Sequence, residues 1–193
     1  MNRRNLLIVT ASLILVATLI VVYFEVRAEP VGAISEKWDR SGHADQTSES
    51  FVHWDEDDPP VIPTGCAKCH STYGYLDFLG QDGSAAGSVD AEAETGSVIF
   101  CNVCHNESAH AMTSVTFPSG DEITDLGAEA ACLQCHQGRQ STVSVNEAIG
   151  GLPDDEISED LGFINVHYYV GAATKMGTEV QRAYEYDGQG YAG

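Results

Sequence analysis

The sequence predicts a mainly α protein with extensive irregular loops and little or no β-sheet. No stretch alternates apolar and polar residues for long enough to indicate a regular sheet. A pair of cysteines spaced three apart occurs three times, and this spacing places both thiols on one side of a helical turn. Glycine is abundant at 19 residues and aromatic residues make up 8% of the chain, so we expect a thin apolar core and long loops.

Each cysteine pair is followed directly by a histidine, in the pattern C-x-x-C-H that attaches c-type haem. Both thiols can add to the two vinyl groups of one haem, and the histidine then faces the iron as its proximal ligand. The first, second and third attachment units are Cys66–His70, Cys101–His105 and Cys132–His136. They predict three covalently attached haem c groups, held by Cys66, Cys69, Cys101, Cys104, Cys132 and Cys135, with His70, His105 and His136 as iron ligands.

Other uses of paired cysteines fit this pattern less well. Zinc ribbons and iron–sulfur sites also use C-x-x-C pairs, but they do not require a histidine after each second cysteine. A four-ligand site needs an even number of pairs, whereas this chain has three. All six cysteines belong to the attachment units, so none is left for a structural disulfide or a free thiol. Haem c is therefore favoured, with zinc, iron–sulfur and disulfides as the alternatives.

The sixth position of each iron decides its chemistry. A second histidine makes a low-potential electron-transfer centre, methionine raises the potential, and an open position permits substrate chemistry. The histidines outside the attachment units can close all three irons, although each could instead be a surface histidine: His43, His53, His110 and His167. We expect His110 to reach a neighbouring haem rather than that of its own unit. Met112 and Met176 are weaker alternatives, and the surplus histidine indicates a spectator or a ligand for a haem of another chain.

The first 28 residues predict an export segment. A basic start at Asn2-Arg3-Arg4 precedes an apolar run over residues 6–24, which is long for a signal-peptide core and near the minimum for spanning a bilayer. Small residues up to Ala28 favour a cleaved signal peptide slightly over an N-terminal membrane anchor. Either way, we expect residues 29–193 to form one domain that is periplasmic, on the cell surface or extracellular. Only residues 6–24, if uncleaved, would anchor it in the membrane.

The exported domain begins with two segments that carry spare histidines. Residues 38–45 predict a short helix or turn that presents His43, and bulky neighbours in residues 51–54 surround His53. Further on, residues 80–97 are rich in Gly, Ala, Ser and acidic residues, which indicates a flexible solvent loop. The acidic residues of this loop could bind calcium, but they lack a regular ligand pattern: Asp82, Asp90, Glu92 and Glu94.

Short elements are expected around the attachment units. Residues 73–79 can pack on a haem face, and residues 115–120 predict a short extended piece that ends in a turn. Residues 121–134 predict a helix that leads into the third attachment unit. Arg139 is one of few cations that can pair with a haem propionate. Residues 165–169 lead into a helix that runs through Met176 toward Ala183.

The chain is strongly acidic, with 29 acidic and 9 basic residues and a formal net charge of −20 at pH 7. Such a surface excludes nucleic acid and anionic lipid as partners and favours a basic partner or cation-rich surroundings. Two interpretations stay open: the acidity serves docking, or it is a solvated surface such as that of a salt-adapted organism.

Together these segments resemble the multihaem c-type cytochromes of anaerobic respiration, a group that includes tetrahaem and octahaem cytochromes and cytochromes that polymerise into extracellular wires. The resemblance covers residues 36–193 and rests on the attachment units, on residues 38–45 and 51–54, on Cys135-His136-Gln137-Gly138-Arg139 and on Val166-His167-Tyr168. It implies a haem-cored fold whose closely spaced haems, mostly with two histidine ligands, pass single electrons. It also implies redox partner proteins, other cytochrome subunits or self-assembly.

Similar proteins often carry further attachment units after a segment like residues 184–188, which leaves two readings of the chain's end. It is the N-terminal part of a longer cytochrome, or a short member whose surplus histidine serves a haem of another subunit. An electron carrier is the leading function, because no general acid–base pair or nucleophile arrangement stands out. The alternatives are a wire subunit, and a subunit of a multihaem reductase or oxidase of small nitrogen or sulfur compounds. The reductase or oxidase would need an open sixth position.

Overall fold

The computed structural model describes residues 2–3, 10, 12–20, 31–153, 155–167, 170–182 and 184–193. The chain divides into an N-terminal part, Met1–Asp45, and a C-terminal part, Gln46–Gly193, each described by itself. Among the described residues, no helix has the length and apolar character needed to cross a bilayer. Much of the expected export segment, including residues 4–9, 11 and 21–30, lies outside the described residues.

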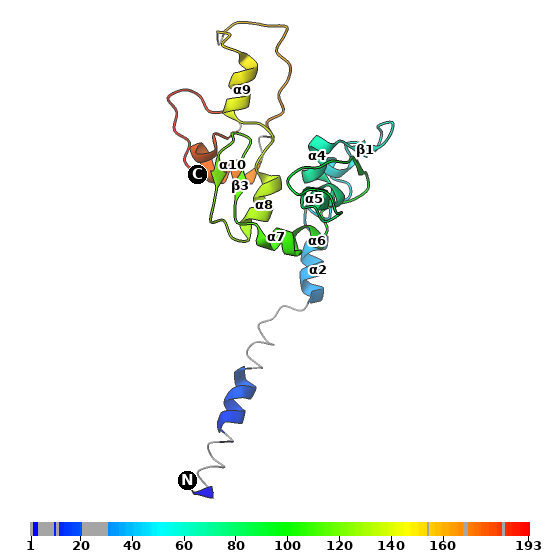
Figure 1. Cartoon of the computed structure of the whole chain (residues 1–193), viewed down its shortest axis with the longest axis vertical. Helices are drawn as coiled ribbons and strands as arrows, with labels where there is room; N and C mark the ends of the chain where they lie inside the picture. The colour runs from blue at the N-terminus through cyan, green and yellow to red at the C-terminus, as the bar shows by residue number, and fades with distance from the viewer. Residues whose placement is uncertain are drawn as a thin grey trace. The chain divides into compact units, whose positions relative to one another are not determined.

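The N-terminal part contains helix α2 (Val31–Asp39), which carries only the first two residues of the segment 38–45 expected to be a short helix or turn (Figure 1). The helix ends at Asp39, and turns follow through residue 44. The backbone N–H groups of Ser41 and Ala44 donate to the carbonyls of Trp38 and Ser41 in these turns. His43 is exposed there, so the expectation of a turn that presents this histidine is confirmed.

The C-terminal part is built from short helices joined by long loops, with little sheet (Figure 1). This confirms the predicted mainly α class with extensive loops. Two antiparallel strand pairs are described, β1 (Val61–Ile62) with β2 (Ala93–Glu94) and β3 (Val115–Thr116) with β4 (Glu122–Ile123). The helices are α3 (Glu49–Val52), α4 (Thr64–His70), α5 (Thr72–Phe78), α6 (Cys101–Cys104), α7 (Glu107–Ala111), α8 (Glu129–His136), α9 (Thr142–Ile149), α10 (Gly171–Met176) and the 3-10 helix η1 (Gly177–Val180).

A sharp corner at Ser71 joins α4 to α5. Ser71 is extended, and its hydroxyl accepts hydrogen bonds from the N–H groups of Tyr73 and Gly74, which caps the start of α5. The two helices then cross at close range, because a Cβ on Gly74 would clash with the carbonyl oxygen of Ala67. Glycine at position 74 is therefore required for this helix pair.

The segment of residues 80–97 is more ordered than expected. Residues 93–94 form β2 on β1, and Ala93 and Ser97 are buried. The buried carboxylate of Asp77 accepts hydrogen bonds from the N–H groups of Asp90, at 3.0 Å, and Ala91, at 3.2 Å. These bonds fold the segment back over α5, so the expectation of a flexible solvent loop was wrong for its second half.

The extended piece expected over residues 115–120 is confirmed. It is β3, followed by a turn in which the N–H of Phe117 donates to the carbonyl of Asp121. The helix expected from residue 121 begins only at Glu129, because residues 122–123 pair with β3 instead. Positive φ angles at Asp125 and Gly127 also keep the intervening residues out of a helix.

The helix expected after residues 165–169 is present as α10, which continues into η1. Tyr168, Tyr169 and Ala183 lie outside the described residues. α10 packs on α8 through an apolar cluster and through an ion pair between Lys175 and Glu129. The buried members of this cluster are Val115, Phe117, Ala130, Leu133, Ala172 and Val180.

Candidate haem-attachment site

The first attachment unit lies on α4, which begins after Pro63 and ends at His70. Its helical turn places Cys66 and Cys69, both half-buried, on one side of the helix. Ile62, Ala67 and Ala93 form an apolar cluster beneath the helix, and Cys66 packs against this cluster. Two thiols and a histidine are therefore presented together, as the attachment of a haem requires.

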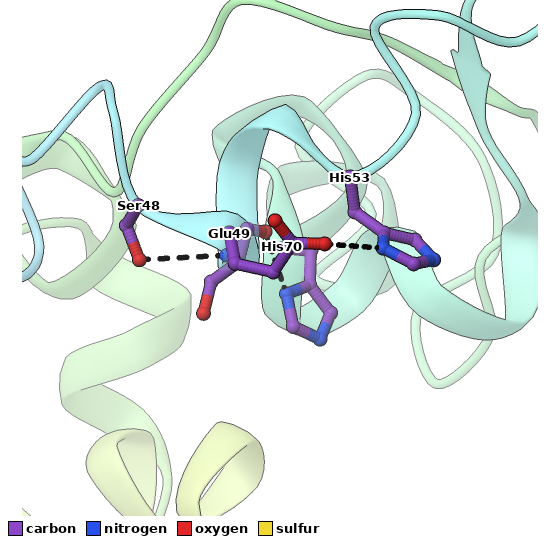
Figure 2. Close-up of polar contacts among 5 residues, drawn as sticks. Ser48, Glu49, His53 and His70 are labelled. Atoms are coloured by element: carbon purple, nitrogen blue, oxygen red, sulfur yellow. Dashed lines mark hydrogen bonds and ion pairs between the residues drawn. The ribbon is translucent and has the colours of Figure 1, made fainter.

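The imidazole of His70 is oriented by the backbone of α3. Its Nδ1 donates a hydrogen bond to the carbonyl oxygen of Ser50 at 2.8 Å (Figure 2). Such a bond fixes the tautomer of a metal-ligating histidine and leaves Nε2 for the metal. Burial lowers the pKa of His70 below its ordinary value, and the neighbouring His167 and His53 lower it further. The neutral ring that results is the form that binds metals.

His167 faces His70 from the other end of the chain. The centres of the two rings lie 6.2 Å apart, with an angle of 59° between the ring planes. A metal–imidazole bond is about 2 Å long, so two imidazoles on opposite sides of one iron have ring centres roughly 6 Å apart. His167 has φ 57°, and among the described residues its buried Nδ1 has no hydrogen-bond partner. The distance fits two imidazoles that share one iron.

The second attachment unit lies on α6 and ends at His105. The turn after it leads into α7, which brings His110 back beside His105. Asn106 caps α7: its side-chain oxygen accepts from the N–H of Ala109 at 2.8 Å, and its Nδ2 donates to the carbonyl of Asn102, also at 2.8 Å. The turn places the rings of His105 and His110 with their centres 5.9 Å apart. We expected His110 to reach a neighbouring unit, whereas the structure places it beside the histidine of its own unit.

His53 lies near the first attachment unit but has another partner. Its Nδ1 is 2.8 Å from Oε1 of Glu49, four residues earlier (Figure 2). Trp54 stands edge-on between the two histidines, with its ring centre 4.9 Å from that of His53 and 5.4 Å from that of His70. His53 is thus close enough to the first unit to remain a candidate ligand. His43 belongs to the N-terminal part, which is described by itself.

The third attachment unit ends α8, with His136 and Cys132 exposed and Cys135 half-buried. α8 packs against α4, which carries the first unit, and against α7, which follows the second. The two methionines considered as ligands, Met112 and Met176, pack against the apolar cluster on α8. This contact gives both methionines a packing role.

The attachment units converge, which the sequence did not indicate. The thiol of Cys135 donates to the carbonyl oxygen of Lys68 at 3.5 Å, and that of Cys69 donates to the carbonyl oxygen of Gln134 at 4.0 Å. Interaction between the two thiols lowers the pKa of Cys69 and raises that of Cys135. Burial raises the pKa of the Cys104 thiol, and nearby Cys132 raises it further. The third unit therefore adjoins both others.

Tyr75, on α5, lies at the centre of this arrangement and is fully buried. Its hydroxyl donates to the carbonyl oxygen of Ala131 at 3.2 Å and lies 3.8 Å from the sulfur of Met112. Burial raises the pKa of Tyr75 well above its usual range, and nearby thiols contribute further: Cys135, Cys104, Cys132 and Cys69. These cysteines come from all three units. Sequence reasoning gave residues 73–79 a packing role but did not single out Tyr75.

Two neighbouring contacts hold the units in this arrangement. Thr72, beside Tyr75 on α5, accepts a hydrogen bond from the N–H of Phe100 at 2.9 Å and donates to the carbonyl of Val98, which places the chain just before α6. Arg139, after the third unit, lies beside the first: its Nη2 would be 3.9 Å from a Cβ on Gly65. The haem propionate with which Arg139 is expected to pair would therefore be that of the haem at the first unit.

The calcium ligands considered in the loop of residues 80–97 are only partly brought together. Carboxylate oxygens of Asp77, Asp82 and Asp90 lie within 4.8 Å of one another. Asp77 is buried, but its oxygens are already satisfied by backbone N–H groups and by the hydroxyl of Ser84 at 3.1 Å. The cluster is therefore explained by hydrogen bonding that orders the loop.

Comparison with known proteins finds no family model, no curated protein and no solved structure that matches this chain.

Proposed function

We propose that this protein is an exported multihaem c-type cytochrome that carries single electrons through three covalently attached, mostly bis-histidine haems. The proposal is carried by the packing of α8, which bears the third unit, against α4 of the first unit and against α7 after the second. Cofactors held by these units would lie close together, as the passage of electrons between them requires. They would also supply much of the apolar core that the polypeptide lacks.

The residues present fit the cofactor. The first unit offers two thiols on one helical turn and a histidine oriented by the Ser50 carbonyl. The histidine pairs His70–His167 and His105–His110 have ring centres 6.2 and 5.9 Å apart, close to the separation that a shared iron would impose. A haem bound by two imidazoles supplies low-potential one-electron chemistry, its iron cycling between the ferric and ferrous states.

The polypeptide contributes position, orientation and charge. The α4–α5 corner and the contact of Cys69 with Cys135 bring the units together, and the Ser50 carbonyl orients an imidazole. With 29 acidic residues against 9 basic ones, the protein's charge stabilises the ferric form and lowers the reduction potentials. The same charge favours redox partners that present a basic surface. Residues 1–28 are proposed to direct export to the periplasm, the cell surface or the extracellular space.

The test is the mass and absorption spectrum of the protein expressed in a host that matures c-type haem. We expect three added haem masses, a low-spin spectrum without a methionine-to-iron band, and no stoichiometric uptake of carbon monoxide by the reduced protein. A colourless protein would overturn the proposal. Binding of carbon monoxide, nitrite or hydroxylamine at stoichiometric level would favour the reductase or oxidase alternative. Filaments seen by electron microscopy would favour the wire subunit.

A further inference from the structure

We propose that Gly138 is a positioning residue for His167. The turn after the third attachment unit would then hold in place the sixth ligand of the haem at the first unit. The inference rests on the proposed function, because it concerns the sixth ligand of the haem at the first unit. It is carried by the contacts of Gly138 and by the conformation of the segment that holds His167.

Gly138 is in close contact with both sides of His167. A Cβ on Gly138 would lie 3.1 Å from Cγ2 of Val170 and 3.3 Å from the carbonyl oxygen of Val166. Val166 is 2% exposed, so this side of the segment has little room to retreat. Gly138 has φ 88°, a conformation that favours glycine over residues with side chains. Only glycine therefore lets the segment approach this closely.

The turn that bears Gly138 is tied to α8. Gln137 ends the helix and is buried, and its Nε2 donates to the carbonyl oxygen of Gln134 at 2.8 Å. The next residue, Arg139, reaches Gly65 at the start of α4. The turn begins where the third unit ends, and it leads to Arg139, whose side chain lies beside the first unit.

His167 is itself held in an unusual conformation. It has φ 57°, and its N–H donates to the side chain of Asn165 at 3.1 Å. A histidine in the left-handed region is uncommon, and such residues cluster at functional sites. Because Val166 and Val170 flank His167 and both meet Gly138, displacing them moves the imidazole away from His70. Gly138 acts through His167 and does not itself touch the cofactor.

The test compares Gly138→Val with Gly96→Val in the full-length, haem-loaded protein. Gly96 has φ 84°, close to that of Gly138, but a Cβ there meets nothing within 4 Å. Both variants place valine at a similar positive φ, and only Gly138→Val pushes on the His167 segment. Gly138→Ala is a milder second variant, because its Cβ alone meets Val170 and Val166. His167→Ala shows the signature of a lost ligand.

The readouts are the haem count by mass, the spin state by electron paramagnetic resonance, and carbon monoxide bound per reduced protein. We expect Gly138→Val to keep the haem count of the parent while about one iron per protein becomes high-spin and binds carbon monoxide, as in His167→Ala, with Gly138→Ala intermediate. Gly96→Val should match the parent. Added imidazole should restore the low-spin spectrum of His167→Ala.

The inference fails if Gly138→Val and Gly138→Ala keep the parent's spin state and carbon monoxide uptake, or if Gly96→Val opens an iron equally. It also fails if His167→Ala opens no iron. A parent protein without haem would instead defeat the proposed function, so the two failures are distinguishable.

Discussion

The thiol of Cys135 donates a hydrogen bond to the carbonyl oxygen of Lys68 at 3.5 Å, although the two residues belong to the third and the first attachment units. The second unit meets the third where α7, which follows the second unit, packs against α8. The third unit therefore lies next to both others, and the order of the units in space differs from their order along the chain.

This arrangement predicts which haems influence one another. Oxidation of one centre changes the potential of another by about 1–2 kcal/mol at roughly 10–15 Å, for an effective dielectric constant of about 20. We expect such coupling between the third haem and each of the others, and a weaker coupling between the first and the second. A redox titration resolved by nuclear magnetic resonance measures these couplings.

His167→Met identifies the first haem in that titration, because a methionine at the sixth position raises the potential and leaves C-x-x-C-H intact. Its effect should fall mainly on the midpoint of the third haem. In the matched variant, His110→Met, which marks the second haem, the effect should also fall mainly on the third. Dominant coupling between the first and second haems would contradict the proposed order.

Tyr75→Phe is expected to destabilise the protein by roughly 1–2 kcal/mol, because the part-buried hydrogen bond to the Ala131 carbonyl is lost. The free energy of unfolding is measured by denaturant titration of the haem-loaded protein. Tyr73→Phe is the matched control: its side chain is 58% exposed, and we expect a change within about 0.5 kcal/mol. Equal effects of the two substitutions would show that the hydrogen bond of the Tyr75 hydroxyl does not contribute to the free energy of unfolding.

Tyr75 also predicts a loss of stability at alkaline pH. Burial is the largest cause of its raised pKa, so the native state keeps this proton to a higher pH than the unfolded chain does. The contribution is complete below the ordinary tyrosine pKa of about 10 and falls above it, by at most about 1.4 kcal/mol per pH unit. Unfolding titrations at several alkaline pH values should show a shallower decline for Tyr75→Phe. Parallel curves for the two proteins would refute this account.

Asn106→Ala is expected to loosen His110. The substitution removes the cap on Ala109 and the bond to the Asn102 carbonyl, at a cost of about 1 kcal/mol. We expect the haem at the second unit to bind carbon monoxide in part of the molecules, as measured by optical titration of the reduced protein. Asn102→Ala, at an exposed position one helical turn earlier, should bind none. If His110→Ala also leaves that iron closed, His110 is not its ligand.

Local chemistry made part of this protein predictable. The spacing within C-x-x-C-H is set by one helical turn, so the helices at all three attachment units could be anticipated from neighbouring residues. The turn at Gly120 and the extended residues before it follow from equally local preferences. The helix expected from Asp121 was misplaced, because pairing of residues 122–123 with β3 outweighed their local preference.

By itself, the sequence determined which residues are candidates to hold the proposed cofactors and that short helices present them, because these properties depend on residue type and local spacing. The tertiary structure alone decided that His167 faces His70, that Cys69 meets Cys135 and that Tyr75 lies among the thiols. These contacts join segments far apart in the chain. They arise from packing and backbone approach, such as that at Gly138, which no local pattern encodes.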